Sequence, residues 1–339
     1  MTAIAGSEAT VARCAALAER VLDEVERSIV GKREALRLVL LGMLGSGHVL
    51  LEDLPGLGKT LMARSFATAL GLRFTRVQFT PDLLPADLTG APVYDPRTGD
   101  LSFRPGPVFT QLLLADEINR TPPKTQAALL EAMSEHQVSA DGETRALPSP
   151  FIVLATDNPI EFEGTYPLPE AQLDRFIARV RLGYPEASDE RELLRRRVES
   201  GTPEPPTAQR VTDAGQLLAM RRVVEHVEVD EELLAYVVAL VAATRRHPQC
   251  AVGASPRAAL ALLQLARGHA LLSQRDFLTP ADVKAVAVAA LGHRLVLRPE
   301  LWVRRVCGDD VITDVLRQVP VPATLPPRTI RDTTPGSSP

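Results

Sequence analysis

The chain has 339 residues, of which 45% are apolar, and its formal net charge is −4. This length allows two domains, and the apolar fraction is sufficient for a sizeable core. The basic residues are scattered along the sequence, so the composition gives no argument for a broad electropositive surface, and a nucleic-acid partner is not expected.

Cysteines, histidines and apolar runs restrict the compartment and the kind of site. Cys14, Cys250 and Cys307 have no spacing typical of a disulfide framework or metal site, which favours a reducing compartment. The six histidines are dispersed, so a zinc site is not expected. No run approaches the ~18 apolar residues of a membrane helix, and no basic patch with an apolar core opens the sequence. We therefore expect a cytoplasmic protein without membrane insertion.

Helical and strand patterns alternate in the first half of the chain. Apolar residues recur at helical spacing over residues 8–29 and 32–46. Short apolar runs then alternate with helical patterns, which is typical of a doubly wound α/β domain with a parallel sheet. Five buried strands are predicted, at residues 48–52, 74–79, 112–115, 151–156 and 177–182.

Two segments interrupt this alternation, and the pattern changes near residue 185. Residues 93–104 and 137–147, the latter turning at Asp141-Gly142, each predict a hairpin. After residue 185 the patterns are helical to about residue 317, which predicts an all-helical lid domain. We divide the chain into an N-terminal helical extension (1–28), an α/β core with two inserts (29–185), a helical lid (186–318) and a disordered, proline-rich tail (319–339).

The segment from Asp53 to Thr60 follows a predicted strand and opens a helix, as a G-x-x-x-x-G-K-[ST] phosphate loop requires. Glycines let backbone N–H groups approach phosphates at a helix N-terminus. Lys59 is expected to reach the β- and γ-phosphates of ATP, and Thr60 to ligate Mg²⁺. The first glycine of the pattern is replaced by Asp53, an acidic residue beside the triphosphate. The full set of predicted nucleotide-binding residues here is Asp53, Pro55, Gly56, Leu57, Gly58, Lys59, Thr60 and Leu61.

Two further strands end in polar residues. A run of apolar residues stops at Asp116-Glu117, where Asp116 is expected in the Mg²⁺ shell and Glu117 to orient and deprotonate the attacking water. The strand at 151–156 leads to Asn158, whose amide could hydrogen-bond this water or the γ-phosphate; an ordinary Asn-Pro turn is the alternative. The carboxyl ends of parallel strands meet at one edge, so these groups predict a site for ATP and Mg²⁺.

The order of loop, Asp-Glu, Asn and helical domain resembles the AAA+ ATPases, P-loop NTPases with this division into core and lid. Longer runs resemble the MoxR family of AAA+ proteins between about residue 28 and Arg257. They are Gly-His-Val-Leu-Leu-Glu at 47–52, Asp-Glu-Ile-Asn-Arg at 116–120, Pro-Lys-Thr-Gln at 123–126 and Tyr-Pro-Leu-Pro-Glu-Ala-Gln-Leu-Asp-Arg-Phe at 166–176.

The resemblance assigns roles to further residues. Arg175, in Leu-Asp-Arg-Phe, corresponds to the arginine finger that acts on the neighbouring subunit's nucleotide; a surface ion pair is the alternative. Arg257 follows Ser255-Pro256 at a helix start and corresponds to the second sensor, expected to complete the ATP site of its own chain. Ile29-Val30-Gly31 matches the segment that packs the adenine, with Val30 and Gly31 as contacts, although a plain interhelical turn is also open. The hairpins match inserts facing the pore of a ring.

The resemblance implies a hexameric ATPase that remodels or activates a protein client, often together with a partner bearing a von Willebrand A domain. No Asp-x-Ser-x-Ser motif of such a domain is present in this sequence. Three alternatives stay open: a nucleic-acid translocase, a metal-chelatase motor subunit, and a slow ATP-gated switch in which Asp53 weakens the site.

Overall fold

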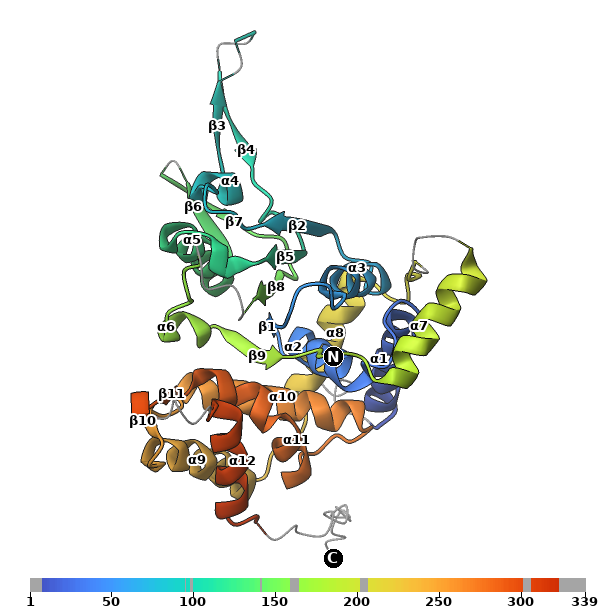
Figure 1. Ribbon diagram of the computed structural model, residues 1–339, viewed down its shortest axis with the longest axis vertical. Coiled ribbons are helices and arrows are strands. Elements are labelled where there is room, and N and C mark those ends of the chain that lie inside the picture. Colours follow the sequence, from blue (N-terminus) through green and yellow to red (C-terminus); the bar gives the residue numbers. More distant parts are fainter. Residues whose placement is uncertain are drawn as a thin grey trace, which may run out of the picture.

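The computed structural model describes residues 8–94, 96–97, 100–140, 142–158, 165–201, 207–300 and 306–322 (Figure 1). Its helices are α1 (Glu8–Glu26), α2 (Arg33–Leu44), α3 (Lys59–Ala69), α4 (Pro85–Thr89), α5 (Pro123–Glu135), α6 (Glu170–Leu173), α7 (Ala187–Ser200), α8 (Ala214–Glu225), α9 (Glu231–Arg246), α10 (Pro256–Leu272), α11 (Pro280–Leu291) and α12 (Gly308–Gln318), with 3₁₀ turns η1 (Ile118–Arg120) and η2 (Gly292–Arg294). Its strands are β1 (His48–Glu52), β2 (Phe74–Gln78), β3 (Gly90–Tyr94), β4 (Leu101–Pro105), β5 (Leu112–Asp116), β6 (Gln137–Ala140), β7 (Glu143–Ala146), β8 (Ile152–Asp157), β9 (Phe176–Val180), β10 (Cys250–Val252) and β11 (Val296–Leu297).

The five predicted strands form one parallel sheet in the order β2-β5-β8-β1-β9. Their bounds agree with the prediction to within two residues, and the α/β fold is confirmed. Successive side chains point to opposite faces of a strand, so Leu112 and Leu114 enter one apolar cluster while Leu113 and Ala115 enter another. The sheet is therefore covered on both faces, as its continuous apolar strands predict.

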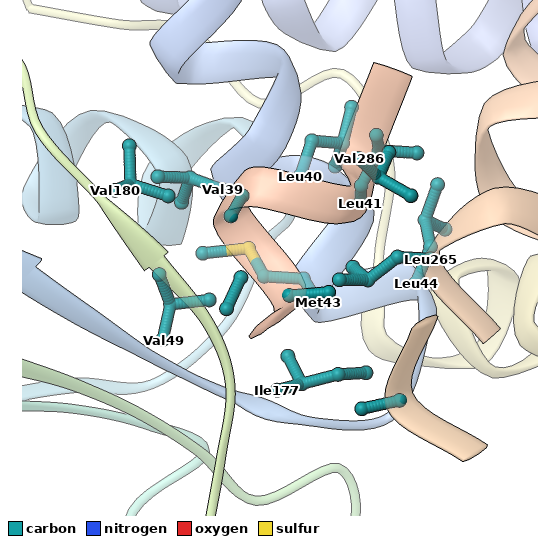
Figure 2. Packing of buried hydrophobic residues seen from close by; sticks show 14 of the residues in the cluster. Val39, Leu40, Leu41, Met43, Leu44, Val49, Ile177, Val180, Leu265 and Val286 are labelled. Atoms are coloured by element: carbon teal, nitrogen blue, oxygen red, sulfur yellow. The ribbon is translucent and has the colours of Figure 1, made fainter. Parts of the chain in front are cut away.

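Helix α2 lies between the sheet and the lid. Figure 2 shows Met43 and its neighbours on α2 packed against Val49 of β1 and Ile177 of β9, and also facing Leu265 of α10 and Val286 of α11. The same apolar cluster includes the buried face of α1, which contacts α2, α3 and α10. The predicted N-terminal extension therefore packs into the core through α1, and the lid shares that core.

The lid is mainly helical, with one small addition. Helices α7–α12 follow β9, and between them β10 and β11 pair antiparallel. The prediction of an all-helical second domain missed this ribbon because two- and three-residue strands leave no periodic pattern. Helix α12 ends at Gln318, close to the predicted residue 317, and residues 323–339 of the predicted tail lie outside the described residues.

Both predicted hairpins are present. β3 pairs with β4 and β6 with β7, and Figure 1 shows the β3–β4 hairpin projecting from the body of the molecule. The guanidinium of Arg145 on β7 lies 3.8 Å from the ring centroid of Phe103 on β4, which ties the two hairpins together. Within the described parts of the chain, no helix combines the length and apolar character that crossing a membrane requires.

Candidate ATP site

The phosphate loop connects the carboxyl end of β1 to α3. Gly56 and Gly58 have φ angles of 84° and 83°, a left-handed conformation that favours glycine. Gly58 directly precedes α3, so the N–H groups of the first helical turn are directed toward the loop. The Lys59 ammonium donates to the Asp53 carbonyl oxygen at 2.6 Å. Burial lowers the pKa of Lys59, and the nearby carboxylates of Asp53, Asp116 and Glu117 oppose this shift.

The side chain of Asp53 is buried and points toward the end of β9. Its carboxylate accepts hydrogen bonds from the backbone N–H groups of Leu182 and Gly183, the latter at 3.1 Å. Its own N–H donates to the Asp157 carbonyl oxygen at 3.2 Å. The loop therefore accommodates Asp53 at the position where the pattern has glycine, because backbone N–H groups outside the loop bind its carboxylate.

Asp116 and Glu117 lie at the end of β5, at the same edge of the sheet as the loop. The Asp116 carboxylate accepts from the Thr156 hydroxyl at 2.7 Å and from the Arg76 guanidinium at 2.7 Å and 3.0 Å. Glu117 has a φ angle of 57°, and its carboxylate accepts from Gln78 at 2.6 Å and from Arg120 at 3.2 Å. Both carboxylates are thus held in fixed orientations by hydrogen bonds.

Arg76, Gln78 and Thr156 are site residues that the sequence analysis missed. Gln78 pairs in register with Asp116, and Arg76 is two residues earlier, on the same face of β2. Thr156 precedes the polar end of β8 and also accepts from the Glu117 N–H at 2.7 Å. The polar side chains of Arg76 and Gln78, two residues apart on a predicted buried strand, are the signal that could have revealed them.

The predicted sensor Asn158 follows β8 and is buried at this edge, where its carbonyl oxygen accepts from the Asn119 amide at 3.1 Å. The preceding residue, Asp157, pairs in register with Glu52 of β1. Burial and, after it, the Glu52 carboxylate raise the pKa of Asp157 to about 6, while Lys59 acts in the opposite direction. Lys59, Asp116, Glu117 and Asn158 are therefore brought together as predicted.

These residues fit a nucleotide with Mg²⁺. A Cβ atom built at Gly56 would have no atom within 4 Å, so the loop is open on that side, and Thr60 lies in the first turn of α3. A lysine, a threonine hydroxyl and the carboxylate of Asp116 are the donor set expected around phosphates and a hard cation.

Ile29-Val30-Gly31 lies next to the loop. A Cβ atom built at Gly58 would be 3.6 Å from Cδ1 of Ile29. Gly31 has a φ angle of 72°, and a Cβ there would stand 1.9 Å from a carboxylate oxygen of Asp189 in the first turn of α7. The structure thus places Val30 and Gly31 between the loop and α7; their contact with adenine stays a prediction.

Arg175 lies at the opposite edge of the sheet, directly before β9. Its guanidinium donates to the carbonyl oxygen of Leu130 and to the hydroxyl of Ser134, both on α5. β1 separates this edge from the loop by about 16 Å of strand. Arg175 is therefore remote from the loop of its own chain, which is consistent with the expected action on a neighbour.

Arg257 also lies at this opposite edge. The Ser255 hydroxyl, which caps α10, donates to the Asp174 carboxylate at 3.0 Å and 3.1 Å, and the charge of Arg257 acts on His48 at the amino end of β1. The structure thus places Arg257 away from the loop of its own chain, and its role as second sensor stays a prediction. The lid docks α10 beside the start of β9, so the exposed Arg257 shares an edge with Arg175.

Several residues of the runs at 116–126 and 166–176 have a supporting role. The buried Gln126 side chain donates to the carbonyl oxygens of Ile118 and Tyr166, and the Tyr166 N–H donates to the carbonyl oxygen of Asn119 at 2.6 Å. These bonds tie the segment before Arg175 to the segment after Glu117. The two runs, which are distant in the sequence, are therefore connected by hydrogen bonds beside the site.

Comparison with known proteins agrees with this geometry. Residues 48–178 match the ATPase family associated with various cellular activities (AAA), and residues 242–315 match the AAA lid domain. Chaperone MoxR1 of Mycobacterium tuberculosis is 44% identical over 90% of this chain and 82% of its own length. Protein MoxR of Methylorubrum extorquens is 32% identical over 90% of this chain and 95% of its own length.

A solved structure shares the whole architecture. The crystal structure of a presumed ATPase from Cytophaga hutchinsonii superposes with a TM-score of 0.85 at 38% identity, covering 92% of this chain and 97% of that one. An identity of this size over most of both chains exceeds what a shared fold alone produces. The chain therefore belongs to the MoxR family of AAA+ ATPases.

Proposed function

We propose that the protein is an ATP-hydrolysing, chaperone-like AAA+ motor that works as a homo-oligomeric ring, with six subunits as the expected number. The observation that carries the proposal is the convergence of Lys59, Asp116, Glu117 and Asn158 at the carboxyl edge of one parallel sheet. A relative named Chaperone MoxR1 supports the chaperone-like role.

The residues divide the hydrolytic work among them. Mg²⁺, when bound with ATP, neutralises charge on the β- and γ-phosphates. Lys59 binds the same phosphates and must exchange its present acceptor, the Asp53 carbonyl oxygen, for them. Glu117 takes the proton of the attacking water on its carboxylate, while Gln78 keeps that carboxylate oriented. Asn158 orients the water or the γ-phosphate through its amide.

Hydrolysis is tested with a Glu117→Gln variant, which keeps the shape of the side chain but removes the base. We expect phosphate release by the assembled protein to fall about 10²- to 10⁴-fold with nucleotide binding retained. An Asp230→Asn variant is a matched control, because it also neutralises an acid, one that caps α9 in the lid. Equal rates for Glu117→Gln and wild type would refute the motor and favour a slow ATP-gated switch.

Arg175 and Arg257 are proposed to serve the nucleotide of the adjacent subunit, because both lie at the edge opposite their own loop. Mixing subunits tests this. Arg175→Ala and Arg257→Ala chains should each be inactive alone, with losses on the order of 10³-fold for the finger. Each should regain activity when mixed with Lys59→Ala chains. In a mixed ring, the intact loop of the arginine variant can face the intact arginines of a Lys59→Ala neighbour. An Arg257→Ala chain that regains nothing would place Arg257 back in its own site.

The proposed client is a protein. The β3–β4 hairpin exposes apolar side chains, with 44% of Val93, 59% of Tyr94 and 71% of Leu101 accessible. Such side chains suit a polypeptide better than a phosphate backbone, which requires clustered positive charge. ATPase stimulation by DNA that decreases with salt would instead favour the nucleic-acid translocase.

The proposed second partner is a protein with a von Willebrand A domain, which rests on the family resemblance. Affinity capture with the Glu117→Gln chain in the presence of ATP is the direct test, because a motor that cannot hydrolyse ATP retains its client. Wild-type protein with ADP is the control. Recovery of a magnesium or cobalt chelatase subunit would support the metal-chelatase alternative instead.

A further inference from the structure

Asp53 connects three parts of the ATP site through three different groups. Its carbonyl oxygen accepts the Lys59 ammonium, and its N–H donates to Asp157, next to Asn158. Its carboxylate accepts from the N–H groups of Leu182 and Gly183. A glycine at this position could make the first two contacts but not the third. The replacement of glycine by aspartate therefore adds one specific connection to an otherwise ordinary phosphate loop.

The segment that receives this connection is the junction between core and lid. β9 ends at Val180, α7 begins at Ala187, and Gly183 between them has a φ angle of 63°. The Tyr184 carbonyl oxygen of this segment accepts from the Lys32 ammonium at 2.7 Å. Residues 182–184 are thus bonded on one side to the loop and on the other to the segment that follows Gly31.

The helix beyond the junction, α7, lies on the surface of the protein. None of the α7 residues is buried, and 65% of Leu194 and 81% of Val198 are exposed. Its first turn carries Asp189, which lies against Gly31. The first turn of α7 therefore lies against elements that also surround the nucleotide site, while Arg196, further along the helix, donates to the carbonyl oxygens of Glu26 and Arg27 at 3.4 Å and 3.2 Å.

We propose that Asp53 is a positioning residue that transmits nucleotide occupancy of the phosphate loop to residues 182–184 and to α7. The reasoning rests on the proposed function, since it takes the loop to bind ATP. Phosphates draw the Lys59 ammonium away from the Asp53 carbonyl oxygen, and the loop then settles around the nucleotide. The Asp53 carboxylate passes this change to the two backbone N–H groups that it holds.

Hydrogen exchange of the Leu182 and Gly183 amides measures the connection directly, first in nucleotide-free protein. A hydrogen bond to a buried carboxylate is expected to slow amide exchange about 10- to 100-fold. Asp53→Gly should lose this protection, and Asp53→Asn, which keeps an acceptor, should lose only part of it. Asp230→Asn neutralises a carboxylate in the lid that likewise accepts from a backbone N–H, and it should leave these two amides unchanged.

The second measurement repeats the exchange with Mg-ADP and with Mg-ATPγS. In wild type, protection should rise in the loop, at residues 182–184 and in the first turn of α7. In Asp53→Gly, protection should rise in the loop alone, which a merely structural role for Asp53 would not produce. Unchanged protection of Leu182 and Gly183 in nucleotide-free Asp53→Gly would overturn the inference, as would a wild type whose junction does not respond to bound nucleotide.

The two proposals fail in different ways. A wild type that binds nucleotide and hydrolyses ATP but shows no junction response contradicts only the role of Asp53. A wild type that binds no nucleotide contradicts the proposed function, and the nucleotide-free comparison still decides whether the Asp53 contact exists.

Discussion

Asp157 offers a quantitative test of the electrostatics of the ATP site. Its pKa is raised to about 6 from an ordinary 3.8, first because it is largely buried and then because it faces Glu52. A carboxyl group with a raised pKa binds its proton more tightly in the folded than in the unfolded chain. Below about pH 4, Asp157 therefore does not change the free energy of unfolding. From pH 4 to pH 6, its unfavourable ionisation in the folded chain lowers the free energy of unfolding by a growing amount. About two pKa units correspond to roughly 3 kcal/mol of unfolding free energy above pH 6.

Replacing Asp157 by Asn removes this cost. The nucleotide-free variant should equal wild type near pH 4 and become more stable as the pH rises, by up to about 3 kcal/mol at pH 7. For a chain of 339 residues this corresponds to a midpoint difference of about 4 °C. Asn is nearly isosteric, so packing changes contribute little.

The measurement compares thermal unfolding of the two proteins with EDTA across pH 4.5–8. A pH series on wild type alone is insufficient. Burial lowers the pKa of His48 to about 4, so the folded protein loses stability through His48 as the pH falls through the same range. The two titrations have opposite signs and partly cancel, whereas the difference between wild type and Asp157→Asn isolates the carboxyl group. Two parallel curves from pH 4.5 to 8 would refute the raised pKa and its assigned cause.

Two further predictions concern packing and the orientation of the base. Gly42→Ala should destabilise the protein by about 1–3 kcal/mol, because the new methyl would stand 2.4 Å from Cγ2 of Val49; Gly268→Ala, whose nearest atom is 3.0 Å away, should be close to neutral in the same denaturant titration. Gln78→Ala should lower kcat about tenfold with nucleotide affinity retained, because Glu117 loses its 2.6 Å donor; an unchanged kcat would show that Gln78 does not orient the base.

The α/β core and the loop between β1 and α3 were predictable from sequence because their signals are local. Buried parallel strands are continuous apolar runs, and the loop from Asp53 to Thr60 is a short pattern in which backbone conformation and residue type are linked. The edge where Asp116, Glu117 and Asn158 meet follows from a general property of parallel sheets. The predicted strands and the five-stranded sheet were accordingly confirmed.

The direction of individual side chains depended on pairings that only the folded chain defines. Arg76 and Gln78 reach the acids of β5 because of the β2–β5 register, which joins residues about 40 positions apart. The Asp53 carboxylate turns to Leu182 for the same reason: β9 lies beside β1 in the sheet although the two strands are distant in sequence.

Arg257 shows most clearly where sequence information ends. The Ser255-Pro256 helix start was predicted correctly, and Ser255 caps α10 as expected. The edge of the sheet that α10 meets depends on the docking of the whole lid, which buries apolar surface of α2, α10 and α11 in one cluster. That docking is a non-local packing solution. The sequence by itself therefore determined the loop from Asp53 to Thr60 and the acids at the end of β5, whereas only the tertiary structure decided which edge of the sheet presents Arg257 and which backbone groups Asp53 binds.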